Sequence, residues 1–106
     1  MANNYKNAKV SLTSADTTTV LTTSAGSTNV IKSILVAEYS GNADTIDLTI
    51  VAGSDTFNLF KVKAVGANTT VELLTAPLVL EEGEILKATA ATANRLHVVA
   101  SLLEVS

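Results

Sequence analysis

The chain has 106 residues and a mass of 11.0 kDa, which suits one compact domain and is too short for two of ordinary size. Its formal net charge is -3 and its seven basic residues are scattered, so there is no basic stripe to follow a phosphate backbone. We therefore expect no nucleic-acid partner. Cysteine is absent, which excludes disulfides, thiolate metal sites and a cysteine nucleophile.

The first seven residues, Met1 to Asn7, are polar and lack an alternating pattern. They predict an N-terminal arm (1–7) that is either frayed or ordered by contact with a partner. No apolar run that resembles a secretory signal follows them. Because no stretch approaches the ~20 apolar residues of a membrane helix, we also expect no membrane partner.

Two short strands are expected before residue 28. Ala8, Val10 and Leu12 alternate with polar residues and predict the first strand, and the run from Thr17 to Thr22 predicts the second. Small polar residues and glycine follow each run at 14–16 and 24–27, where they favour turns.

The segment 40–43, Ser-Gly-Asn-Ala, is the strongest hairpin signal in the chain. It lies between an apolar run at 30–39 and a run at 45–51 in which Ile46, Leu48 and Ile50 alternate with polar residues. The pattern predicts that these two runs are paired strands.

The strand expected at 30–39 is apolar on both faces. Strict alternation places Ile31 and Leu35 on one face, and Val30, Ile34 and Val36 on the other. A small domain can bury one face of a sheet in its own core. The second apolar face is therefore better explained by a neighbouring subunit or partner.

Further strands are expected at 56–63, 69–75, 85–91 and 95–105. In the first of these, the apolar residues change faces between Leu59 and Phe60, which a bulge at that point would explain because an extra residue reverses all later side chains. Pro77 cannot donate to a β-ladder, so the link around it is a candidate crossover between sheets.

About eight strands at roughly 10- to 12-residue intervals, with turn residues in the gaps, are typical of a β-sandwich or barrel. We expect an all-β, antiparallel sandwich of jelly-roll type in a single domain over 8–106, with an up-and-down barrel as the alternative.

The residues that carry chemistry do not form a recognisable site. His97 is the only histidine and lies within an expected strand, which favours a solvent or interface position over a catalytic one. The spacing of Asp44, Asp47 and Asp55 matches no calcium loop. Glu81, Glu82 and Glu84 are expected to form a solubilising turn that stops a sheet edge from pairing, with paired-carboxylate glycoside chemistry as the weaker alternative. We expect no enzymatic activity, no cofactor and no metal.

The order of several segments resembles that of small virion structural proteins of tailed bacteriophages, including capsid decoration (cement) proteins and head or tail accessory proteins. The segments that carry it are Asn29-Val30-Ile31-Lys32-Ser33-Ile34, Ser40-Gly41-Asn42-Ala43, Ile46-Asp47-Leu48-Thr49-Ile50 and Leu80-Glu81-Glu82-Gly83-Glu84-Ile85-Leu86-Lys87-Ala88. The resemblance implies a particle component that is located in the virion after assembly in the host cytoplasm. It also implies a trimer if the protein is a cement protein.

The residues expected to bind partners come from the arm, the two-sided strand and the second face of the last strand. They are Tyr5, Lys6, Val30, Ile34, Val36, Val99 and Leu103. The expected partners are further copies of the chain, as a homo-oligomer, and a major capsid protein or another virion protein. A tail or head-to-tail component is the nearest alternative, and a carbohydrate-binding sandwich module is the third.

Overall fold

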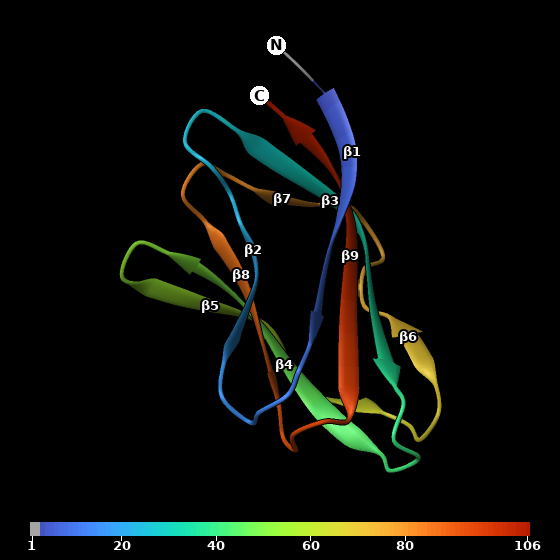
Figure 1. The fold of residues 1–106 in the computed structure, drawn as a ribbon. Coiled ribbons are helices and arrows are strands. Elements are labelled where there is room, and N and C mark those ends of the chain that lie inside the picture. The colour runs from blue at the N-terminus through green and yellow to red at the C-terminus, as the bar shows by residue number, and fades with distance from the viewer. Residues whose placement is uncertain (1–2) are drawn as a thin grey trace.

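The computed structural model describes residues 3–106, which form nine strands in two antiparallel sheets (Figure 1). The strands are β1 Asn3–Ser11, β2 Thr18–Thr22, β3 Thr28–Glu38, β4 Asp44–Ala52, β5 Asp55–Val65, β6 Thr70–Glu72, β7 Leu78–Leu80, β8 Ile85–Ala90 and β9 Leu96–Val105. The expectation of an all-β, antiparallel sandwich is confirmed. There is one more strand than expected because the link at 78–80 forms β7.

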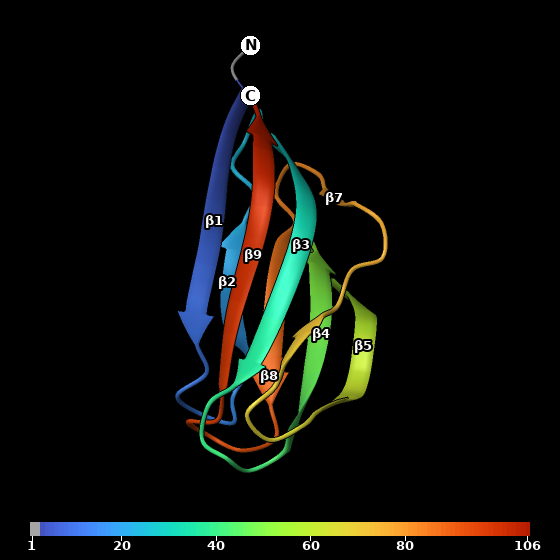
Figure 2. The same cartoon turned by 90° about the vertical axis from the view of Figure 1, so that its right-hand side faces the viewer.

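One sheet has five strands in the order β1-β9-β3-β6, with β7 also paired to β3, and the other has four in the order β2-β8-β4-β5. Figure 2 shows β1, β9 and β3 side by side in front of β2, β8 and β4. The core lies between the two sheets and consists mainly of Leu, Ile, Val and Ala. Residues 3–106 include no helix that is long and apolar enough to cross a membrane.

The prediction of a hairpin around 40–43 is wrong, because the two strands that this turn joins belong to different sheets. β3 pairs with β6, β7 and β9, whereas β4 pairs with β5 and β8. The turn residues do reverse the chain, but they carry it across the sandwich. The link around Pro77 is not a crossover either, since β6 and β7 both pair with β3 in the five-stranded sheet.

A bulge in β3 changes which of its side chains face the core. The pairing with β9 shifts between Ile31 and Ser33, so Lys32 is an extra residue and reverses the positions that follow it. As a result Ile31 and Ile34 are both fully buried, while Leu35 is 39% exposed. The grouping expected from strict alternation is therefore wrong after Lys32.

Residues 3–7 differ from the expected arm. They form the first half of β1 and pair with β9 from Asn3↔Val105 to Asn7↔Ser101. The domain itself supplies their backbone partners, so this segment needs no second protein to become ordered. Met1 and Ala2, the first two residues of the expected arm, lie outside the described residues.

Candidate interaction surfaces

The ionisable residues are dispersed and do not form a chemical site among residues 3–106. Among residues 3–106, no three His, Cys, Asp or Glu side chains come together as a metal site would require. The His97 ring stacks on the Tyr39 ring, with centroids 4.1 Å apart and an angle of 19° between the ring planes. This arrangement agrees with the surface or interface position expected for His97.

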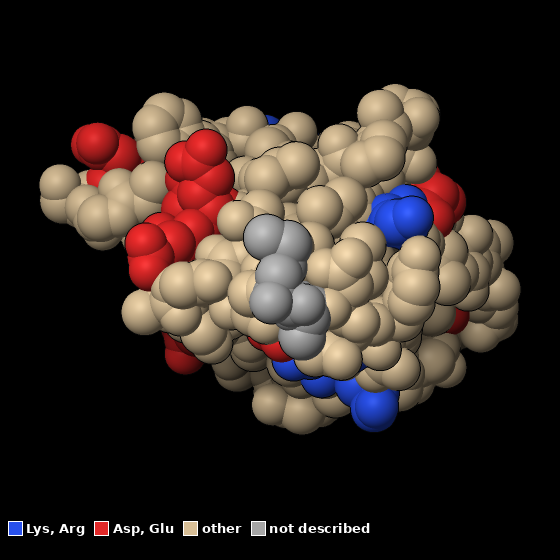
Figure 3. Space-filling model, turned by 90° about the horizontal axis from the view of Figure 1, so that it is seen from above, with Lys and Arg blue, Asp and Glu red and all other residues tan. Residues whose placement is uncertain are grey.

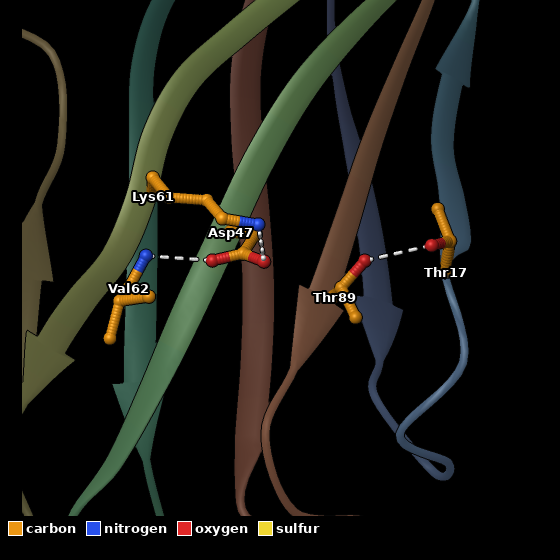
Figure 4. Close-up of polar contacts among 5 residues, drawn as sticks. All are labelled: Thr17, Asp47, Lys61, Val62 and Thr89. Atoms are coloured by element: carbon orange, nitrogen blue, oxygen red, sulfur yellow. Dashed lines mark hydrogen bonds and ion pairs between the residues drawn. The ribbon is translucent and has the colours of Figure 1, made fainter. Parts of the chain in front are cut away.

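The three aspartates near β4 and β5 have separate roles. Asp44 is buried and accepts a hydrogen bond from the Thr92 N–H at 3.1 Å. Asp47 accepts the Val62 N–H at 2.7 Å and forms an ion pair of 3.4 Å with Lys61 (Figure 4). Asp55 begins β5 after the β4–β5 turn. Two of these carboxylates therefore hold backbone groups in place.

Two bulges interrupt the pairing of β4 with β5. Leu48 pairs with Phe60 and Thr49 with Asn58, so Leu59 is an extra residue, which confirms the bulge predicted at this point. Leu59 and Phe60 both pack against the core. A second irregularity lies opposite Asp47, where Val62 has a positive φ of 53°.

Val62 is expected to be a strained position, because a left-handed backbone is unfavourable for a β-branched residue. Its side chain is 61% exposed and contributes little packing. We expect Val62→Gly to raise the free energy of unfolding by about 0.5–1 kcal/mol, the relief of strain exceeding the greater entropy of glycine in the unfolded chain. Urea denaturation would measure this change. Val62→Ala is the control, because it trims the side chain but keeps the strain, and an equal gain from it would contradict the explanation.

Glu38 is a buried carboxylate at the end of β3. It accepts hydrogen bonds from the Ser40 N–H and hydroxyl, from the Gly41 N–H at 2.9 Å and from the Asn68 N–H at 3.0 Å. Burial by itself would raise the pKa of Glu38, but these hydrogen bonds outweigh it and lower the pKa from 4.5 to about 2. The charged carboxylate thus ties the 40–43 turn to the turn before β6.

Glu72 has a similar role at the edge of the five-stranded sheet. Its carboxylate accepts hydrogen bonds from the Ser33 hydroxyl, the Ile34 N–H at 2.8 Å and the Leu74 N–H at 3.2 Å. Burial acts to raise the pKa of Glu72, but the hydrogen bonds have the larger combined effect and lower it. Glu72 therefore carries a fixed negative charge beside the outer surface of β3.

The outer surface of the five-stranded sheet, which we call the β9 face, is largely apolar. It carries four of the six large hydrophobic residues that are most exposed, and half-buried side chains lie between them. The exposed residues are Tyr5, Leu35, Tyr39 and Val79, and the half-buried ones are Val30, Val99 and Leu103. A polar row of Asn7, Ser101 and Ser33 divides these apolar residues into two groups. Exposed apolar groups of this kind typically mark a contact site.

The β9 face includes four of the seven residues expected to bind partners: Tyr5, Val30, Val99 and Leu103. Lys6 lies on the opposite side of β1 and forms an ion pair with Glu104 at 3.4 Å. Ile34 and Val36 are fully buried in the core, so their expected role in binding is wrong. Leu35, Tyr39 and Val79 also lie on this face, although the sequence pattern does not indicate them as contact residues. Strict alternation puts Leu35 on the other face of β3, and Val79 lies in a segment too short to predict a strand.

The outer surface of the four-stranded sheet, which we call the threonine face, is polar. A shallow hollow of about 360 Å³ lies on it, lined by Thr17, Asp47, Thr49, Val51, Thr56, Asn58, Lys61, Lys87 and Thr89. The hydroxyls of Thr17, which directly precedes β2, and of Thr89 on β8 are 2.9 Å apart and hydrogen-bonded (Figure 4). The two outer surfaces of the sandwich thus differ sharply in character.

Charged residues are also unevenly distributed. Seen from above, most of the visible acidic side chains lie toward the projecting β4–β5 hairpin, and the visible lysine and arginine side chains lie mainly on the other side (Figure 3). On the β9 face, Lys9 of the edge strand β1 is paired with Val99 of β9. At the opposite edge of the same face, Glu72 of β6 is paired with Leu35 of β3. The face therefore has a positive edge and a negative edge.

Comparison with known proteins assigns no family. No family model matches the chain, and no curated protein is similar to it. Two solved structures of a pentameric capsid protein from metagenomic phage sequences are similar in part, each with a TM-score of 0.48 and 20% identity. They cover 94% of this chain, which spans 59% and 60% of theirs. A likeness at this level establishes neither a family nor a function.

Proposed function

We propose that this chain is a non-enzymatic structural protein of a tailed-phage virion, and specifically a capsid decoration protein that assembles on the head shell and stabilises it. The observation that carries the proposal is the contrast between the apolar β9 face and the polar threonine face. A monomer in water gains nothing from leaving such a surface exposed, whereas an assembled protein covers it. The sequence resemblance supplies the phage setting and a trimer as the stoichiometry.

A stabilisation assay tests the role directly. Adding the purified protein to phage heads that lack it should raise the temperature at which the shells release DNA, because bound subunits bridge neighbouring capsid proteins. Sedimentation of the protein with the heads measures binding. Binding to tails instead of heads would favour the nearest alternative, a tail or head-to-tail component. Binding to neither would contradict a virion role.

The threonine face supports a second candidate, a carbohydrate-binding module. Its hollow offers hydroxyl, carboxylate, amide and ammonium groups to a polar ligand. It has no aromatic side chain for a sugar ring to stack on, which makes this function less well supported. Calorimetric titration with a panel of soluble glycans would test it, and Asn58→Ala should abolish any heat of binding that arises in the hollow.

A further inference from the structure

The β9 face has a regular layout that its strand register defines. One row across the sheet reads Tyr5, Leu103, Val30 and Val79, from β1 through β9 and β3 to β7. A second row reads Lys9, Val99, Leu35 and Glu72, ending on β6 instead of β7. Between the two lies a polar row of Asn7, Ser101 and Ser33, which the pairing described below would place against its own copy. The first and second rows each have two apolar residues at their centre, and the second row has opposite charges at its ends.

This layout is complementary to itself under one symmetry operation. A two-fold axis that runs parallel to the strands, between two copies placed face to face, keeps every row and exchanges its two ends. Val99 of one copy then lies opposite Leu35 of the other, and Lys9 lies opposite Glu72. Each of these contacts occurs twice. The same operation places Tyr5 opposite Val79 and Leu103 opposite Val30.

The shape of the face agrees with this pairing. A hollow of about 280 Å³ lies between β1 and β9, lined in part by Lys9, His97 and Val99. The two-fold operation brings the exposed Leu35 side chain of the second copy to this position. A side chain that projects from one half of the face therefore meets a hollow in the other half.

Lys32 is the remaining cation near the apolar rows. Its ammonium lies 5.7 Å from the centre of the Tyr5 ring, and Tyr5 is on the edge strand β1. The Lys32 side chain therefore extends from β3 over β9 toward β1, and its aliphatic part crosses the face. In the pair, the two Lys32 ammonium groups would lie on opposite sides of the two-fold axis.

The face is also large enough. Three strands about 4.8 Å apart with nine residues of about 3.3 Å each, together with the three-residue strands β6 and β7, give a flat area of roughly 520 Å² per copy, and projecting side chains add to it. A pair of copies would then bury more than the ~1,000 Å² expected of a specific interface.

We propose that the β9 faces of two chains pack against each other about a two-fold axis parallel to the strands, with Val99 against Leu35 at the centre and Lys9 against Glu72 at both ends. Facing sheets in β-sandwiches pack about 10 Å apart with a modest angle between their strands, which suits these side chains. The pairing does not depend on the virion role. A trimeric or hexameric assembly would need a second contact elsewhere on the molecule.

Light scattering on a sizing column provides the first test. At tens of micromolar, the protein should elute as a species of about 22 kDa, twice the 11.0 kDa of one chain. Val99→Glu should weaken this pair by at least ~100-fold, because each new carboxylate would be buried against Leu35 of the other copy and would draw the neighbouring Lys9 away from Glu72. Thr49→Glu is the matched control on the threonine face and should leave the pair intact. Circular dichroism would check that both variants remain folded.

A double-mutant cycle tests the orientation. Lys9→Gln and Glu72→Gln should each weaken dimerisation, and their effects should be coupled by about threefold to tenfold for the two ion pairs together. Within one chain these residues are three strand spacings apart, about 14 Å, which exceeds the Debye length of ~8 Å at physiological salt. Any coupling must therefore arise between copies.

The possible results separate the pairing from the virion role. A monomer or a trimer at tens of micromolar overturns the two-fold pairing and leaves the virion role intact. So does a dimer that survives Val99→Glu or shows no coupling between Lys9 and Glu72. A hexamer that Val99→Glu converts to trimers supports the pairing and adds the second contact.

Discussion

Replacing Ile34 with alanine is expected to lower the free energy of unfolding by about 3 kcal/mol. Ile34 is fully buried between the sheets, so the shorter side chain would lose its packing and leave a cavity. Domains of this size are stable by about 5–15 kcal/mol, which makes the loss a large part of the total. Urea denaturation at low micromolar protein would measure it without a contribution from self-association.

The neighbouring residue provides the control. Leu35→Ala removes a side chain of equal size from the β9 face, and we expect it to change the free energy of unfolding of the monomer by less than about 1 kcal/mol. The contrast between the two variants depends on the bulge at Lys32. Equal losses, or a larger loss for Leu35→Ala, would show that β3 has the opposite orientation.

The second large effect concerns acid stability and Glu38. Because the pKa of Glu38 in the folded protein is about 2 and its usual value is 4.5, the unfolded chain takes up the proton first as the pH falls. Its stabilising contribution is therefore fully present above about pH 4.5 and is lost progressively as the pH falls toward 2. We expect Glu38→Gln to lower the urea midpoint markedly at pH 7.

The difference between the wild type and Glu38→Gln should shrink as the pH is lowered and approach zero near pH 2. Urea midpoints measured at several pH values would follow this convergence. Glu81→Gln is the control for the loss of one negative charge, since Glu81 lies in the exposed β7–β8 turn. A difference that stays constant between pH 7 and pH 3 would show that the Glu38 carboxylate does not have the depressed pKa.

The interaction surface could be predicted from the sequence only in part. Val99 and Leu103 were correctly placed on the outside of the last strand, because β9 has regular alternation throughout. The faces predicted for Ile34 and Leu35 were exchanged, because the extra residue Lys32 reverses the orientation of the side chains that follow it. In the sequence, Lys32 looks like any exposed lysine of a regular strand. A bulge can be predicted from a sequence only when strict alternation would place neighbouring apolar residues on opposite faces, as it does at Leu59 and Phe60 in β5.

The all-β class and the positions of most strands and turns could be predicted from the sequence, since these depend on side-chain alternation and on the backbone preferences of residues such as Gly41 and Pro77. Which strands pair became clear from the folded chain alone. The 40–43 turn reverses the chain whether the next strand joins the same sheet or the opposite one. That choice depends on partners far along the chain, chiefly β9, which separates β3 from β1 and also orders residues 3–7. The residues of the turn itself therefore do not indicate which distant strands will pair.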